Sequence, residues 1–297
     1  MAAGLGGLVV IRLAQSGDEG AIDAFLKPHS ESSMFLRSNL AQFGVGPNRS
    51  DDPRATTFWL IEDGPIRAVF GRSNGGFLMG QSPDNDPADW QAFRDVLHGA
   101  TVAGITGATP QIKVALDVLD LRDAPFSMMR DEPHYKLDLR DLEPPLVDAR
   151  LRPAQPGDFD TLFDWVMDYD TSVLGSSATE ETRIRARTNA HAHMNSDNHR
   201  ILEVGGTPVA KTAFNAALPD MVQIGGVYTP PEHRSKGYAR TAVALHLLEA
   251  RKRGVKIAIL FASGEPACRA YEAIGFQRIG TYTLAILAEP CVIGSDG

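Results

Sequence analysis

A basic loop between an apolar run and a helix is the part of this sequence best suited to chemistry. In "VYTPPEHRSKGYAR" (227–240), two prolines end the apolar run, and Arg234, Lys236 and Gly237 precede a helical pattern. A helix N-terminus leaves backbone N–H groups unpaired, and its dipole favours an anion there. The glycine lets the backbone approach a ligand, and the two cations add positive charge. We interpret the loop as a pyrophosphate-binding segment; the alternative is an ordinary exposed strand–helix turn.

The elements around this loop form a recognisable order. Three strands are predicted before it, at about 199–204, 207–216 and 221–228, and a helix ended by Gly254 follows it. A buried-type strand, a short helix ended by Gly275 and a further strand complete the chain. Two helices precede these elements: one from Phe159, N-capped by Asp158, and one over "TEETRIRARTNAHAHM". The order predicts an α+β fold, a mostly antiparallel mixed sheet with helices on both faces and one parallel pair beside the loop.

The first half of the chain repeats parts of the second. "IRLAQSGDEGAIDAFL" and "LRPAQPGDFDTLFDWV" share an arginine, an alanine, a glutamine, a glycine and an aspartate at one constant offset. Later, "FWLIEDGPIRAVFG" and "RILEVGGTPVAKTAFN" both have the pattern of a β-hairpin. We therefore expect two tandem domains, 1–145 and 149–297, divided near Pro144–Pro145.

The basic loop also resembles a known signature. "RSKGYA" matches the R/Q-x-x-G-x-G/A motif of the GNAT acyltransferases, and "PACRAYEAIGF" resembles the second signature of that family. The P-loop and dinucleotide-binding patterns are both absent. The resemblance covers about Leu151 to Leu287, and with the repeat it implies a tandem GNAT protein with a degenerate first copy.

The resemblance implies acetyl transfer from acetyl-CoA to a primary amine of an unidentified acceptor. The loop amides would hold the pyrophosphate, and the edge of the preceding strand would pair with the pantetheine arm. Gly225-Gly226 would form a bulge that opens the sheet there. The implied cofactor-binding residues are Val227, Tyr228, Thr229, Arg234, Ser235, Lys236, Gly237, Tyr238, Ala239 and Arg240.

Tyr271 matches the tyrosine that protonates the departing thiolate in many relatives. A phenol suits this step because its pKa of about 10 lies near that of a thiol. The alternative is that Tyr271 only packs against the coenzyme. The family often has asparagine seven residues before this tyrosine, whereas this chain has Gly264.

Neither the general base nor the acceptor can be identified from the sequence. Three carboxylates are candidate bases: Glu203, Asp220 and Glu232. The acidic segment "MDYDTSVLGSSATEE" is either a wall that selects a cationic amine or a solvated loop. The histidines of "HAHMNSDNH" lack a metal-binding pattern, so no metal is expected.

The first half lacks the basic loop. Its counterpart, "SPDNDPADW", carries Asp84, Asp86 and Asp89, which would repel a pyrophosphate. "PADWQAFRDVLHG" still predicts the helix that follows, and "MFLRSNLAQFG" predicts an earlier one. We therefore expect a degenerate domain without a cofactor site.

The composition and charge exclude some classes of function and partner. The 297 residues are 43% hydrophobic and 22% charged, and the net charge of -8 argues against a nucleic-acid partner. The two cysteines form no disulfide framework, and no leader segment or membrane span is evident, so a cytoplasmic location without a membrane partner is expected. A non-catalytic acyl-CoA sensor or scaffold is the main alternative to an enzyme, and the oligomeric state stays open.

Overall fold

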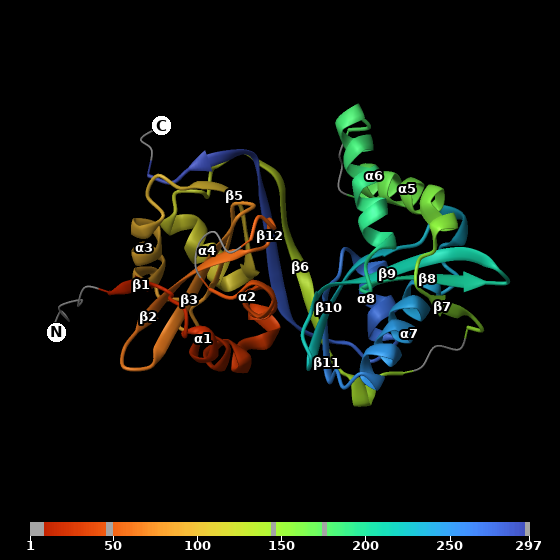
Figure 1. The fold of residues 1–297 in the computed structure, drawn as a ribbon, viewed down its shortest axis with the longest axis horizontal. Coiled ribbons are helices and arrows are strands. Elements are labelled where there is room, and N and C mark those ends of the chain that lie inside the picture. Colours follow the sequence, from red (N-terminus) through yellow and green to blue (C-terminus); the bar gives the residue numbers. More distant parts are fainter. Residues whose placement is uncertain (1–8, 46–49, 144–146, 174–176, 295–297) are drawn as a thin grey trace. The chain divides into compact units, whose positions relative to one another are not determined.

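The computed structural model describes residues 9–45, 50–143, 147–173 and 177–294 (Figure 1). Its contacts divide the chain into two compact units. Unit 1 combines Met1–Glu132 with Gly280–Gly297, and unit 2 is the continuous segment Pro133–Ile279. Both units have an α+β fold, as predicted.

Unit 1 is built on a sheet of strand order β1-β2-β3-β4-β5-β12. All neighbours in this order are antiparallel except β4 and β5. The strands are β1 (Ile11–Leu13), β2 (Thr56–Glu62), β3 (Ile66–Ser73), β4 (Phe77–Gln81), β5 (Thr101–Ala108) and β12 (Gln277–Val292), of which residues 280–292 lie in this unit. The helices are α1 (Glu19–Leu26), α2 (Ser30–Phe43), α3 (Pro87–Val96) and α4 (Thr109–Val118).

Unit 2 repeats this element order around a sheet of order β6-β11-β10-β9-β8-β7. Its one parallel pair is β10 with β11, at the place predicted beside the basic loop. The strands are β6 (Phe126–Asp138), of which residues 133–138 lie in this unit, β7 (Arg150–Arg152), β8 (His199–Val204), β9 (Thr207–Ala217), β10 (Met221–Tyr228) and β11 (Ile257–Phe261). The helices are α5 (Phe159–Asp168), α6 (Glu180–Met194), α7 (Tyr238–Lys252) and α8 (Glu265–Glu272).

Helices cover both faces of the unit 2 sheet. Trp165 of α5 and Ala190 of α6 pack against Ile201 and Tyr228 on one face. Ala242 of α7 packs among Leu202 and Val209 on the other face. Since successive residues of β8 point to opposite faces, this alternation separates the two helix layers.

The two halves of the sequence exchange their last strands. β6, from the first half, pairs in the sheet of unit 2, and β12, from the second half, pairs in the sheet of unit 1. β6 pairs with β11, from Asp138 opposite Ile257 to His134 opposite Phe261. β12 pairs with β5, from Tyr282 opposite Ala108 to Val292 opposite Thr101. The units therefore divide at 132/133 and 279/280, because backbone pairing decides where a strand belongs. The boundary expected at Pro144–Pro145 lies outside the described residues.

The repeated sequence motif forms the same structure twice. In unit 1, Arg12 bonds both Asp18 and Glu62, and Asp18 accepts from the backbone N–H of Gln15 at 2.7 Å. In unit 2, Arg152 bonds Asp158 and Glu203 in the same way, both at 2.7 Å. Each set joins the first strand, the first helix and the second strand.

One detail of this motif concerns the start of α5. Asp158 stands at the N-cap position of α5, but its side chain makes no cap bond to that helix. It accepts instead from the backbone N–H of Gln155 at 2.7 Å and from Arg152. The predicted N-cap position of Asp158 is thus confirmed, although its charged bonds to Arg152 and to the Gln155 backbone take the place of a bond to the helix.

Other local predictions are confirmed. The hairpin of β8 and β9 turns at Gly205 and Gly206, whose φ angles of 56° and 83° lie in the left-handed region that favours glycine. The strands before the basic loop agree with the predicted ranges to within one residue. None of the helices in the described part of the chain is long and apolar enough to cross a bilayer.

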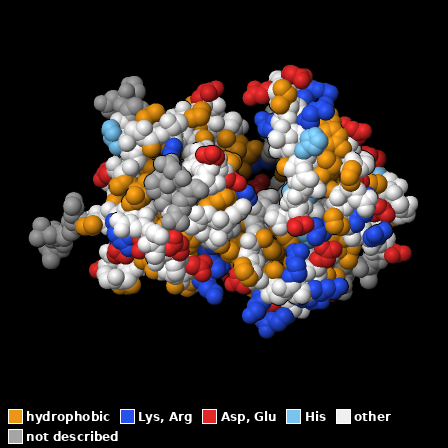
Figure 2. Space-filling model, in the orientation of Figure 1, with side chains coloured by type: hydrophobic (Ala, Val, Ile, Leu, Met, Phe, Trp, Pro, Cys, Tyr) orange, Lys and Arg blue, Asp and Glu red, His pale blue; other side chains and the backbone are white. Residues whose placement is uncertain are grey.

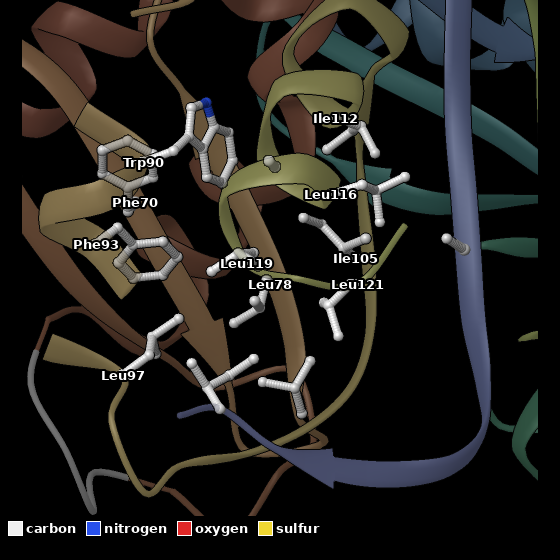
Figure 3. Close-up of a cluster of buried hydrophobic side chains, with 14 of the residues drawn as sticks. Phe70, Leu78, Trp90, Phe93, Leu97, Ile105, Ile112, Leu116, Leu119 and Leu121 are labelled. Carbon is white, nitrogen blue, oxygen red and sulfur yellow. The ribbon is translucent and has the colours of Figure 1, made fainter. Parts of the chain in front are cut away.

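The core of unit 1 is closely packed around aromatic rings (Figure 3). Phe70 stacks on Phe93 with ring centroids 4.7 Å apart, and Trp90 meets Phe70 edge-on at 4.8 Å. All three side chains are fully buried. Phe70 lies on β3, and Trp90 and Phe93 lie on α3. The packing fixes this helix on its sheet, although its preceding loop lacks the basic residues of unit 2.

Candidate functional site

The sheet of unit 2 opens beside β10. The parallel ladder between β10 and β11 runs from Met221/Ile257 to Ile224/Leu260. β10 continues to Tyr228, paired on its other side with β9, and its register shifts between Gly225 and Tyr228. The predicted bulge is present, and Gly226 has a φ of 58°. The last residues of β10 therefore have an edge beyond the ladder with β11, where another extended chain could pair.

The basic loop follows this edge and leads into α7. Ser235 and Gly237 have φ angles of 61° and 79°, and Gly237 is the N-cap residue of the helix. The backbone N–H of Thr241 donates to the carbonyl of Gly237 at 3.0 Å, which starts the helical ladder. The preceding amides, at the positive end of the helix dipole, are thus presented to the loop side, where an anion is favoured.

A pocket of about 860 Å³ joins the loop, the strand edge and helix α8. Most of the predicted site residues line it together. They are Val227, Tyr228, Thr229, Arg234, Ser235, Gly237, Tyr238, Ala239, Arg240 and Tyr271. Lys236 is not part of the lining, and its ammonium donates to the backbone carbonyl of Glu232 at 3.0 Å.

Two features of the lining fit a bound phosphate-bearing thioester. The hydroxyl of Thr229 is buried and has no hydrogen-bond partner among the described residues. Gly237 has a φ of 79°, a conformation that side-chain-bearing residues rarely adopt, and a Cβ there would lie 3.2 Å from Nε of Arg240. The first feature offers an unused polar atom, and the second a close backbone approach.

Tyr271 enters the pocket from α8. Its side chain is only 8% exposed, and its ring meets Phe276 edge-on at 6.0 Å. Pro266, Ala267 and Ala270 of the same helix also line the pocket. Gly264 stands at the N-cap with a φ of 86°, where the family often has asparagine.

The structure links two residues that the sequence had placed in different roles. The hydroxyl of Tyr228 donates to the carboxylate of Asp168 at the end of α5. Burial, and next the bond to Asp168, raise the pKa of Tyr228 above its ordinary value. Arg234 lies nearby, with a nitrogen 3.9 Å from Asp168, and its Nε donates to the carbonyl of Thr229 at 3.0 Å. Neither residue type nor spacing in the sequence could show this contact.

None of the three candidate bases belongs to the pocket lining. Glu203 is ion-paired with Arg152 at 2.7 Å, so it supports the strand–helix motif. The backbone carbonyl of Asp220 accepts from the N–H groups of Lys256 and Ile257. Glu232 is exposed on the loop. These positions leave the proton acceptor unassigned.

The acidic segment after α5 is not a continuous negative wall. Asp170 is 5% exposed and lies 3.3 Å from a guanidinium nitrogen of Arg185. Glu180 and Glu181 are exposed on the first turn of α6, where acidic and basic side chains lie side by side (Figure 2). Residues 174–176 of this segment lie outside the described residues.

A buried lysine behind this segment was missed in the sequence. Lys211 lies on β9 between Ile201 and Tyr228 in register and is 4% exposed. Burial lowers its pKa to about 8, while Asp170 raises it. The strand that contains Lys211 has the apolar pattern of a buried strand. A lysine within that pattern was the one sign in the sequence that a charged side chain is buried there.

The histidines near α6 pack against neighbouring rings. His193 stacks on His199 with centroids 3.9 Å apart, and His191 lies 4.6 Å from the Phe159 ring. Burial lowers the pKa of both His193 and His199, to about 2 and about 4. Across the described ranges, no group of three or more histidine, cysteine, aspartate or glutamate side chains could hold a metal ion.

The corresponding place in unit 1 has a different construction. The loop between β4 and α3 spans only 82–86, and Asp86 caps the helix by accepting from the N–H of Ala88 at 2.9 Å. Asp89 is 1% exposed and is bonded by Ser82 at 2.8 Å and by Arg67. The chain's own carboxylates thus occupy the helix end that a phosphate would need.

Comparisons with known proteins agree with this geometry. Residues 159–276 match the family model described as the acetyltransferase (GNAT) family. A search of curated proteins finds no match to this sequence.

Several solved structures share the fold. A Drosophila protein aligns over 94% of this chain and 99% of its own, with a TM-score of 0.60 and 12% identity. A GCN5-related N-acetyltransferase from Sphaerobacter thermophilus covers 93% of this chain and 94% of its own, with a TM-score of 0.51 and 16% identity. A tandem GNAT protein from the clavulanic acid biosynthesis pathway covers 95% and 99%, with a TM-score of 0.50 and 15% identity. At such identities the likeness shows the fold alone. The family match is therefore that of the domain within residues 159–276, which is a domain of the acetyltransferase (GNAT) family.

Proposed function

We propose that this protein is an N-acetyltransferase that moves an acetyl group from acetyl-CoA directly to a primary amine. The single observation that carries the proposal is the pocket that unites the loop before α7, the free edge of β10 and Tyr271. We further propose that unit 1 binds no coenzyme, since its shorter loop places Asp86 and Asp89 where phosphates would lie.

Each part of the pocket has a distinct task in this proposal. The amides at the start of α7, together with Arg234 and Arg240, would hold the pyrophosphate. The edge of β10 near Val227 and Thr229 would pair with the pantetheine arm as an added strand does. This pairing would place the thioester in the opening between β10 and β11.

Tyr271 would then act on the leaving group. When the neutral amine attacks the thioester carbonyl, the C–N bond forms and the C–S bond breaks, and the departing sulfur needs a proton. The Tyr271 hydroxyl would supply that proton, because a phenol and a thiol have comparable pKa values. The attacking nitrogen releases a proton as it becomes the amide, and that proton would return through solvent to the Tyr271 phenolate. The amine must lose its own extra proton before attack, either to solvent or to a group that the structure leaves unassigned.

Calorimetric titration of acetyl-CoA tests the binding part. We expect about one molecule bound per chain, and loss of binding in the double variant Gly237→Trp and Arg234→Glu. Arg253→Glu makes a single equal charge change just beyond the far end of α7 and serves as the matched control. Binding of two molecules per chain would contradict the proposal that unit 1 binds no coenzyme. Absence of binding to the wild type would refute the proposal that unit 2 binds acetyl-CoA.

Release of free CoA in the presence of a panel of amines tests the catalytic part. We expect acetyl-CoA consumption that depends on the amine and falls strongly in Tyr271→Phe. Binding without turnover for every amine would instead support a sensor or scaffold that holds acyl-CoA.

A further inference from the structure

The first half of the chain contributes directly to the site of unit 2. Segment Pro133–Glu143 comes before the second sequence copy begins, yet it belongs to unit 2. Its strand pairs with β11, and the N–H of Glu143 donates to the carbonyl of Ile274 at 3.2 Å. A Cβ on Gly275 would lie 2.6 Å from the carbonyl oxygen of Asp141, so the two chain segments are in close contact. The segment therefore packs against the turn that directly follows α8.

Helix α8 has two faces with different neighbours. Ala267, Ala270 and Tyr271 are spaced as one helix face and line the pocket. Cys268 and Glu272 are four residues apart and form another face. That second face meets Tyr135 of β6.

Tyr135 is held in one position by its surroundings. It is 1% exposed, and its hydroxyl donates to Oε1 of Glu272 at 2.6 Å. Its ring belongs to the same buried cluster as Leu137, Tyr271 and Phe276. Contacts with the Cys268 thiol and with Glu272 raise the pKa of Tyr135, so it keeps its proton and stays a donor at neutral pH.

We propose that Tyr135 is a positioning residue for Tyr271. Its hydroxyl holds Glu272, the residue next to Tyr271 in the helix, and its ring packs in the same buried cluster as the Tyr271 ring. The angle at which Tyr271 enters the pocket is then set by a strand from the half of the chain that has no cofactor loop. The proposal rests on the proposed function only in giving Tyr271 a catalytic task; the anchoring itself can be tested without turnover.

The experiment is NMR of the full chain with tyrosine labelled by carbon-13 at the ring carbon that bears oxygen. The chain has six tyrosines, and Tyr271→Phe assigns the signal of interest. We expect Tyr135→Phe to shift the Tyr271 signal and to alter its titration with pH. Tyr282→Phe removes another buried hydroxyl, 4% exposed and in unit 1, and is the matched control that leaves the Tyr271 signal in place.

Acetyl-CoA provides the second readout. The turnover of acetyl-CoA should fall between about tenfold and about a hundredfold in Tyr135→Phe, as expected for a misplaced catalytic group. Its dissociation constant should change less than about twofold, because the loop and α7 are untouched. Equal loss of binding and turnover would identify a general structural role and overturn the proposal.

A second variant guards against misfolding. Glu272 is exposed, so Glu272→Ala removes the hydrogen-bond acceptor without opening the core. If this folded variant leaves the Tyr271 signal unchanged, the proposal is refuted. If no tyrosine signal of the wild type responds to acetyl-CoA, the proposed function is refuted. The Tyr271 signals of the wild type and of Tyr135→Phe without acetyl-CoA still decide whether Tyr135 positions Tyr271.

Discussion

Replacing Lys211 by methionine should make the protein more stable at neutral pH. The lysine is 4% exposed on β9, and burial lowers its pKa from 10.5 to about 8. Asp170 raises this pKa in turn, but it is also ion-paired with Arg185 at 3.3 Å. A methionine has nearly the same length and needs no counter-charge, so it should fill the site without the cost of a buried ammonium.

The magnitude follows from the pKa of Lys211. Each pKa unit corresponds to about 1.4 kcal/mol, so a lowering from 10.5 to about 8 corresponds to about 3 kcal/mol. Below pH 8 both the folded and the unfolded states are protonated, and the folded state bears the whole cost. Between pH 8 and 10.5 only the unfolded state still binds the proton, so stability rises with pH. We expect Lys211→Met to gain about 3 kcal/mol at pH 7 and about 1 kcal/mol at pH 10.

Urea unfolding followed by circular dichroism at these two pH values measures the difference. Lys252→Met removes an exposed lysine of α7, and it should change the free energy of unfolding by less than about 1 kcal/mol at both pH values. A Lys211→Met protein that is less stable than the wild type at pH 7 would refute the reasoning. A gain that is equal at both pH values would also refute it, since it would not come from titration of the ammonium.

Three further perturbations test other parts of the structure. Gly237→Ala should cost about 1–2 kcal/mol in a thermal unfolding assay because its φ is 79°, and it should weaken acetyl-CoA binding. Gly275→Ala should cost about 2–3 kcal/mol, since its Cβ would lie 2.6 Å from a backbone oxygen, whereas Gly280→Ala, with open space around it, should be nearly neutral. A fragment of 133–279 should unfold cooperatively, whereas 149–297 should not, because it lacks β6; the opposite result would contradict the assignment of β6 to unit 2.

Much of the local structure could be predicted because it depends on nearby residues. The turn at Gly205–Gly206, the bulge after Gly225 and the loop around Gly237 all require backbone conformations that favour glycine. The arginine and the aspartate recur in the sequence at a constant offset, and the structure shows that they form an ion pair in each unit.

The remaining features depend on residues far apart in the sequence. Nothing in the periodicity of β6 shows that it pairs with β11 rather than with a strand of its own half. The same limit applies to the bond between Tyr228 and Asp168, and to the burial of Lys211 among apolar neighbours. Periodicity identifies a strand and its buried face, but the choice of partner is made by the packing of the whole sheet.

The exchange of the last strands has a consequence for the order of folding. Every residue of unit 2 lies within the continuous segment Pro133–Ile279, whereas the sheet of unit 1 needs β12 beside β5. The bond from Thr106 to the carbonyl of Thr283 closes a separation of 177 residues. Pairing over so long a loop is slow, because chain entropy is lost before the contact forms. During synthesis unit 2 can therefore fold first, whereas the sheet of unit 1 stays incomplete at β5 until β12 has been made.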